Sequence, residues 1–232
     1  ITSGALIRAA VPLSESAALE SGEAMLTSDT TVTWDGGKVR GRRVLRLGAI
    51  ELSSTPVRPD PVRARHVALE AVRSGGLDVA SLTKNGESLR RRLALAHRVF
   101  GDPWPDVSDE ALLARAEEWL DLDALAAGRG SDATSGLRGL LGWRESARLD
   151  EVVPETITVP SGSRIRIDYP EPGSDTSPVL AVKLQECFGW ADGPTVCDGR
   201  VRVVLHLLSP ARRPLAVTDD LASFWASVYP AV

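Results

Sequence analysis

The sequence predicts an α+β protein made of three successive segments: a β-rich region over residues 1–57, a helical segment over 58–153 and a small α/β module over 154–232. Two hydrophobic patterns support this division. In the first and last segments apolar and polar residues alternate, as they do on strands with one buried face. In the middle segment apolar residues recur every three or four positions, as they do on helices. Three prolines between Thr55 and Pro61 mark a linker after the first segment.

The first segment is expected to contain a β-hairpin. The run TTVTWDGGKVRGRRVLRLGAIEL (30–52) alternates on both sides of Asp35-Gly36-Gly37, and glycine readily adopts the positive φ angles of tight turns. Upstream, the Ser/Glu-rich stretch 14–23 favours one or two helical turns, and the short apolar run ALIRAAV (5–11) favours a strand.

Helices are expected throughout the second segment. Residues 87–100 carry an apolar stripe at helical spacing, made of Leu89, Leu93, Ala96 and Phe100. The prolines of GDPWPD (101–106) end that helix, and Ser108 is a suitable N-cap for the next one. A further helix is predicted over 135–149. The buried stripe of the helix that follows Ser108 is expected to comprise Leu112, Ala116, Trp119 and Leu120.

The third segment returns to strands. A hairpin turn is predicted at Cys197–Arg200, a short helix at 185–189 and a final helix at Asp219–Tyr229. Strands are predicted at 156–159, 164–169, 178–184 and 200–208, and the side chains expected to face the core are Ile165, Ile167, Val203, Leu205 and Leu207.

The composition of the 232 residues is that of a globular protein with a buried core, at 43% apolar and 25% charged residues. The net charge of −4 gives no overall attraction to nucleic acid, so any such contact must come from a local patch. Two cysteines are too few for a disulfide framework, which favours a reducing, cytoplasmic location. No apolar run is long enough to span a membrane. Because the only methionine is Met25, the chain is expected to be part of a longer protein.

The sequence has no complete nucleotide-binding or hydrolytic motif. Gly36-Gly37-Lys38 is followed by valine and lacks the rest of a phosphate-binding G-x-x-x-x-G-K-[ST] loop. Asp109-Glu110-Ala111 approaches a DEAH box, but Leu112 occupies the histidine position. A G-x-S-x-G elbow for a nucleophilic serine is absent as well. No catalytic residue is therefore assigned.

Metal ligands are also not indicated. His66 and Glu70 stand one helical turn apart, but zinc needs three or four ligands and no third one is evident. Cys187, Cys197 and His206 could converge, yet their spacing fits no zinc module. No metal site is assigned.

A row of basic side chains is the main candidate for binding. With period 2, Lys38, Arg40, Arg42 and Arg46 share one face of a strand, and this row is called the basic ridge below. The other face carries Val39, Leu45 and Leu47. No acid lies between Asp35 and Glu51, so the ridge is expected to present uncompensated positive charge to a phosphate backbone. The solvated face of an antiparallel sheet gives the same pattern, and this alternative stays open.

The stretch SGSRIRIDY (161–169) repeats the arrangement on a smaller scale. Arg164 and Arg166 alternate with isoleucines, and they are the second candidates for nucleic-acid contact. Arg200 and Arg202 alternate with valines in the same way. Because the pattern occurs three times, it favours ordinary solvent-exposed strand faces over three separate binding sites.

Several stretches point together to one known family. They are VPSGSRIRIDY (159–169), PVLAVKLQECFG (178–189) and GRVRVVLHLLSPARRPLAVTDDLASFW (199–225), with weaker matches at 102–113 and 42–52. In this order and spacing they resemble the C-terminal region of the HrpB family of bacterial DEAH-box ATP-dependent helicases.

The resemblance implies a particular place for the chain. In that family two RecA-like motor domains come first, followed by winged-helix, helical-bundle and OB-like modules and a family-specific C-terminal region. Residues 1–57 would then include the later strands of an OB-like module, a fold that often binds single strands on a β face. The motor, with its ATP and Mg²⁺, is absent from this sequence, and no cofactor is expected in the fragment itself.

The expected function is that of an accessory C-terminal part of an ATP-dependent RNA helicase. It would guide single-stranded RNA or brace the RecA-like motor domains of the same chain, without hydrolysing ATP and without contacting a membrane. The alternative is a protein-docking module that binds a protein partner and never touches nucleic acid. Salt-dependent binding to labelled single-stranded RNA separates the two.

Overall fold

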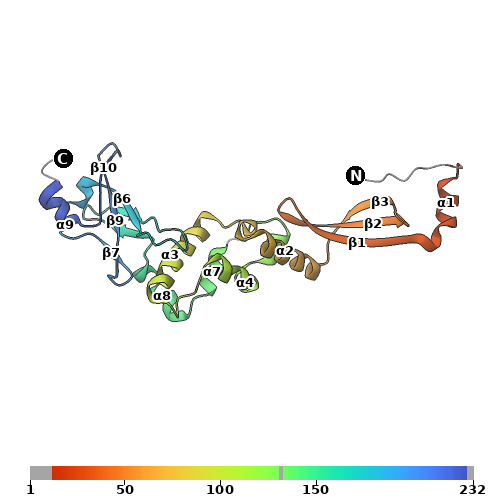
Figure 1. Ribbon diagram of the computed structural model, residues 1–232, viewed down its shortest axis with the longest axis horizontal. Coiled ribbons are helices and arrows are strands. Elements are labelled where there is room, and N and C mark those ends of the chain that lie inside the picture. Colours follow the sequence, from red (N-terminus) through yellow and green to blue (C-terminus); the bar gives the residue numbers. More distant parts are fainter. Residues whose placement is uncertain (1–11, 131–132, 229–232) are drawn as a thin grey trace.

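The computed structural model describes residues 12–130 and 133–228. Figure 1 shows an elongated molecule with a sheet at one end, helices in the middle and a second group of strands at the other end. The predicted mixture of helix and sheet, in the predicted order, is confirmed. The strand predicted at 5–11 lies outside the described residues.

The N-terminal sheet is antiparallel, with strand order β1-β2-β3. Its first two strands pair over their full length, and Gly36 and Gly37, with φ angles of 58° and 78°, form the turn between them. The predicted hairpin and the short helix before it are therefore confirmed. The elements of this region are α1 (Glu15–Ser21), the 3₁₀ turn η1 (Glu23–Met25), β1 (Leu26–Asp35), β2 (Lys38–Leu47) and β3 (Ile50–Val57).

The middle of the chain is helical, as predicted. Side chains of Asp60, Thr83 and Ser108 cap the helices that follow them. The single helix expected over 135–149 was wrong: Gly142, at ψ 160°, is extended, so the chain forms two helices. The elements are α2 (Pro61–Gly75), η2 (Leu77–Ala80), α3 (Lys84–Phe100), α4 (Asp109–Ala114), α5 (Ala116–Trp119), α6 (Leu122–Ala126), α7 (Ala133–Gly139) and α8 (Trp143–Val152).

The C-terminal region combines short sheets. Its main sheet has the order β10-β9-β6, with β6 parallel to β9, and two further pairs, β4-β5 and β7-β8, are antiparallel hairpins. The elements are β4 (Thr156–Thr158), β5 (Arg164–Arg166), β6 (Val179–Lys183), η3 (Leu184–Cys187), β7 (Thr195–Val196), β8 (Val201–Arg202), β9 (Val204–Leu208), β10 (Pro214–Thr218), α9 (Leu221–Ser223) and the π-helical turn η4 (Phe224–Val228).

The strand predicted over 200–208 is divided in two. The amide of Val203 donates to the carbonyl of Pro194, whereas the amide of Val204 donates to that of Pro178. The chain therefore changes pairing partner at this point, from β7 to β6, and β8 ends before β9 begins. The predicted turn at Cys197–Arg200 and the short helix near 185 are confirmed.

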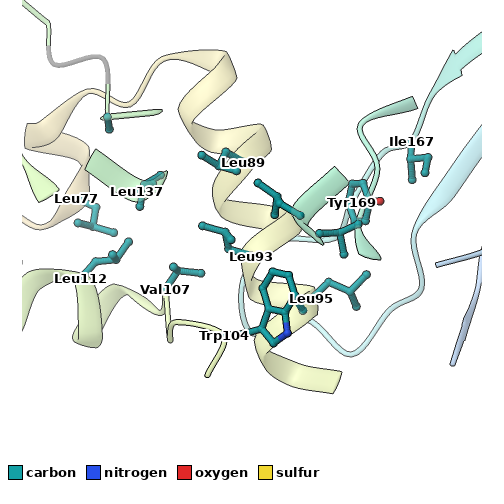
Figure 2. Packing of buried hydrophobic residues seen from close by; sticks show 14 of the residues in the cluster. Leu77, Leu89, Leu93, Leu95, Trp104, Val107, Leu112, Leu137, Ile167 and Tyr169 are labelled. Atoms are coloured by element: carbon teal, nitrogen blue, oxygen red, sulfur yellow. The ribbon is translucent and has the colours of Figure 1, made fainter. Parts of the chain in front are cut away.

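One hydrophobic core runs along the molecule, from Val39 to Phe224. Helix α3 lies at its centre. In Figure 2, Leu89, Leu93 and Leu95 of α3 lie between residues of the neighbouring helices, such as Leu137, and residues of the C-terminal module. The stripes predicted at Leu89, Leu93, Ala96 and Leu112, Ala116, Trp119, Leu120 are buried, with Phe100 partly so, and Ile167, Val203, Leu205 and Leu207 are buried as predicted, with Ile165 partly so.

Within the described ranges, no helix combines the length and the apolar character needed to cross a membrane.

Candidate nucleic-acid interface

The basic ridge lies on β2, the middle strand of the N-terminal sheet. Lys38, Arg40 and Arg42 are exposed, and they alternate with the buried positions Val39 and Gly41. The inner side of this strand packs on the helical segment, since Val39 belongs to the core and β2 contacts α2 and α6. The predicted orientation of these three basic residues is therefore confirmed.

The positive charge of the ridge is partly compensated. Arg40 Nε lies 2.8 Å from a carboxylate oxygen of Asp35, and Arg46 lies 3.7 Å from Glu51. The expectation of uncompensated charge was wrong, because the hairpin and the β2-β3 pairing bring the two flanking acids beside the ridge. All four side chains are exposed by more than a third, so these pairs are weak and open to exchange with a phosphate.

A buried residue also interrupts the ridge. Val44 stands between Arg42 and Arg46 on the same face and is only 4% exposed. Its neighbours across the sheet are Asp29 and Ser54. The continuous part of the ridge therefore consists of Lys38, Arg40 and Arg42, with Arg42 Nη1 donating to the Ser54 hydroxyl at 3.2 Å.

The second candidates lie on β5, in a different sheet from the ridge. Arg164 donates to the Thr156 hydroxyl, at 3.2 Å. Arg166 donates to Glu155 at 2.6 Å and to the Ser88 hydroxyl at 3.3 Å. The structure therefore does not bring Arg164 and Arg166 together with the ridge, and it gives both of them partners within the protein.

The rest of the stretch 161–169 makes structural contacts. Ser163 donates to Glu186 at 2.9 Å, and Asp168 forms an ion pair with Arg91 at 3.6 Å. The Tyr169 hydroxyl donates to the Pro154 carbonyl at 2.7 Å, and burial raises the pKa of this tyrosine far above its usual value. These contacts join β5 to the helical segment and to the turn after β6.

The third alternating pair does not form a single row. The Arg200 guanidinium lies 4.8 Å from the centre of the Phe100 ring, at the end of α3, in a cation–π contact. Arg202 is exposed on β8. Arg200 therefore has a packing role.

Sequence reasoning missed the arginines of α3. Arg92 is 4% exposed; it donates to the Val153 carbonyl at 2.6 Å and pairs with Asp150. Arg91 pairs with Glu171, and Arg98 donates to the carbonyl oxygens of Ser174 and Thr176. The contacts of Arg91 and Arg98 fasten the helical segment to the C-terminal module, and those of Arg92 hold the end of α8, after which the module begins.

The sequence did contain a signal for Arg92. It stands three residues after Leu89 and immediately before Leu93, so it falls on the apolar face of the helix. An arginine at such a position is expected to have buried partners, because an unpaired buried charge is strongly unfavourable.

His97 and the two cysteines have local structural roles, whereas His66 and His206 are exposed. The His97 ring lies 2.7 Å from the Trp104 carbonyl oxygen. Cys187 and Cys197 are buried free thiols, and burial raises the pKa of each to about 11. Among residues 12–130 and 133–228, no three or more histidine, cysteine or carboxylate side chains are grouped so that they could hold a metal ion.

Comparison with known proteins gives consistent relatives. Residues 116–232 match the HrpB_C family model, described as "ATP-dependent helicase C-terminal". Over 214 residues the chain is 40% identical to the ATP-dependent RNA helicase HrpB of Escherichia coli strain K12. The matched region covers 88% of this chain and 26% of that protein. The resemblance inferred from the sequence is confirmed.

Two solved structures agree. The crystal structure of the E. coli DExH-box NTPase HrpB has a TM-score of 0.69 and 39% identity, over 92% of this chain and 27% of that one. The crystal structure of the E. coli DEAH/RHA helicase HrpB has a TM-score of 0.67 and 39% identity, over 90% and 27%. The chain thus spans about a quarter of the length of these relatives.

Proposed function

This chain belongs to the HrpB_C family of ATP-dependent helicase C-terminal regions, and on that premise we propose that it is the accessory part of an ATP-dependent RNA helicase that braces a RecA-like motor. The observation that carries the proposal is the joint at α3, where the helical segment meets the C-terminal module. A single core continues through it, and from the same helix Arg91 and Arg98 bond to the C-terminal module while Arg92 bonds to Val153, the last residue before that module. An elongated body with such a joint can hold distant parts of a larger protein at a fixed separation.

The free end of the N-terminal sheet supports contact with another protein surface. Five apolar side chains there are 38% to 63% exposed: Leu13, Met25, Leu26, Ile50 and Leu52. Leu26 and Ile50 both pair with Leu47, so they extend one apolar face. Clustered exposed apolar residues are typical of interaction sites. In this proposal the surface that covers them belongs to the motor-bearing part of the same cytoplasmic protein, and the sheet is a partial OB-like module.

Catalysis is assigned to the motor alone. In this proposal ATP and Mg²⁺ bind to the motor, since the sequence of this chain has no phosphate-binding loop. The isolated chain is therefore expected to show no ATPase activity. Turnover that survives replacement of Lys38, the only lysine beside a glycine pair, would point to an unassigned site.

RNA guidance is the second candidate function. It is favoured by the exposed row Lys38, Arg40 and Arg42 on one sheet face. A pure protein-docking role is the rival, and it predicts that the chain has no salt-dependent affinity for single-stranded RNA.

The bracing role can be tested in the longer helicase that carries this region. Arg92→Ala should loosen the joint, whereas Asp150→Asn should remove only the exposed half of the ion pair. We expect the temperature at which the ATPase is inactivated to fall by several degrees in Arg92→Ala and to fall less in Asp150→Asn, where the asparagine oxygen can still accept from Arg92. An ATPase that remains active while this region is unfolded would contradict the proposal.

A further inference from the structure

A small polar cavity lies where three elements of the joint meet. It measures about 210 Å³ and lies between α3, α7 and β5, of which α3 and α7 are in direct contact. Its lining includes the side chains of Asn85, Ser88, Arg92, Thr134, Arg138 and Arg166, and it is called the arginine pocket below.

The lining of the arginine pocket is strongly biased towards donors. Three arginines, from three different elements, line it together with one acidic residue, Glu155. Two of these arginines are held in place: Arg92 by Asp150 and the Val153 carbonyl, and Arg166 by Glu155 and Ser88. Arg138 is exposed and forms no ion pair within the described ranges 12–130 and 133–228. One positive charge of the pocket is thus available to a ligand.

We propose that the arginine pocket binds a phosphate group in the backbone of a single-stranded RNA. Guanidinium groups bind phosphate oxygens with paired hydrogen bonds, and the Asn85 amide and the Ser88 hydroxyl add neutral donors. The volume excludes a whole nucleotide, because sites for molecules of that size usually measure roughly 300–1,000 Å³. A single phosphate group fits.

A neighbouring cavity gives the strand a path out of the pocket. It measures about 500 Å³, shares Ser88 and Arg166 with the arginine pocket, and is also lined by the basic residues Lys84 and Arg91 and the acidic residues Glu87 and Asp168. The basic residues of this lining outnumber the acidic ones, and they continue from one cavity into the next. This continuity favours a chain of phosphates over a single small anion. The inference rests on the RNA-binding part of the proposed function and assigns it a place separate from the basic ridge.

The test compares two arginines with the same change of charge. Arg138→Glu alters the pocket, and Arg73→Glu alters an exposed arginine of α2 that lines neither cavity. Circular dichroism first establishes that both variants are folded. Affinity for a fluorescein-labelled 20-nucleotide oligouridine is then measured by anisotropy over a series of salt concentrations. Arg138→Glu should weaken binding about tenfold and reduce the salt slope by about 0.7, as expected for one lost phosphate contact, and Arg73→Glu should change affinity less than about twofold.

The outcomes separate this inference from the function on which it rests. If both variants lose RNA affinity equally, the proposal that the pocket binds RNA is overturned. The same holds if Arg138→Glu binds RNA as tightly as the wild-type chain, and RNA binding is then left to the ridge. If the wild-type chain does not bind the oligouridine, the pocket and the RNA-binding part of the proposed function both fail. A thermal shift with inorganic phosphate that Arg138→Glu abolishes, with RNA affinity unchanged, would assign the pocket to free phosphate and overturn the RNA assignment.

Discussion

Arg92 and Val153 join two regions that lie 61 residues apart: Nε of the buried arginine donates a 2.6 Å hydrogen bond to the valine carbonyl oxygen. Val153 directly follows the last helix and precedes the first strand of the C-terminal module. The bond therefore fixes the residue at which the helical segment ends and the C-terminal module begins. Val153 is fully buried, and Arg92 is the hydrogen-bond partner of its carbonyl oxygen. Loss of this hydrogen bond would therefore leave a buried acceptor without its donor.

Arg92→Ala should lower the free energy of unfolding of this chain by about 2–3 kcal/mol, from the unpaired carbonyl and the lost packing of the arginine stem. Asp150→Asn is the comparison variant: it removes a charge that is 75% exposed but keeps a side-chain oxygen that can accept from the buried Arg92, so its cost should be smaller, at about 1 kcal/mol. Urea unfolding followed by far-ultraviolet circular dichroism measures both. Equal losses would mean that the ion pair, and not the bond to Val153, holds the junction.

Ile167→Ala should lower the free energy of unfolding by about 2–5 kcal/mol, because the side chain is 3% exposed and leaves a cavity. Arg166→Ala, one residue earlier on the opposite face, should cost less than about 1 kcal/mol, since that side chain is 56% exposed. The same urea titration applies. If Ile167→Ala leaves the free energy of unfolding unchanged while Arg166→Ala unfolds the chain, the buried and exposed faces of β5 are reversed.

Stability should decline at alkaline pH. Burial raises the pKa of Cys187 and Cys197 from 9.0 to about 11, and that of Tyr169 rises also. The folded chain thus holds these protons more tightly than the unfolded chain. The contribution of the two thiols is complete below pH 9 and is lost as the pH rises through about 11, at roughly 3 kcal/mol for each thiol. Urea midpoints measured from pH 7 to 11 test the slope.

A double variant, Cys187→Ala with Cys197→Ala, controls for the thiols. Its stability should decline less steeply between pH 9 and 11, because only the tyrosine of the three groups remains. An unchanged slope would mean that the thiols ionise normally in the folded protein.

Reversing two charges of the basic ridge should flatten the salt dependence of RNA binding. Lys38→Glu with Arg42→Glu removes two exposed basic residues from one face, and each lost phosphate contact reduces the slope by roughly 0.7. Arg43→Glu is the matched control, because Arg43 is exposed on the opposite face of the same strand. If the control reduces the salt slope of RNA binding as much as the double variant does, net charge alone governs binding. The ridge is then only a solvent-exposed face of the sheet.

The local elements were predictable because they depend on neighbouring residues. Two glycines that adopt positive φ fix the turn at Gly36-Gly37, and the three- and four-residue spacing around Leu93 fixes the buried face of α3. The break at Val203 was not predicted, because the consecutive apolar residues Val203, Val204 and Leu205, which interrupt the alternation, are also compatible with one continuous strand. Only the distant carbonyls of Pro194 and Pro178 divide the strand.

The charge of the candidate site could not be predicted for the same reason. Arg40 and Asp35 are separated in the sequence by a turn, and the pairing of β1 with β2 brings them within 2.8 Å. The arginine pocket depends on longer distances still, since Arg92, Arg138 and Arg166 come from three elements. A pattern within one strand carries no information about such convergence.

The central claim is that the helical segment and the C-terminal module form one rigid body through α3. Native-state hydrogen exchange of this chain tests it most directly, because it reports the opening free energy of each element separately. We predict that the amides of α3 and β9 open with the same free energy, and that Arg92→Ala lowers both by the same amount. If β9 keeps its full protection in Arg92→Ala while α3 loses its own, the two parts are independent and the chain is not a brace.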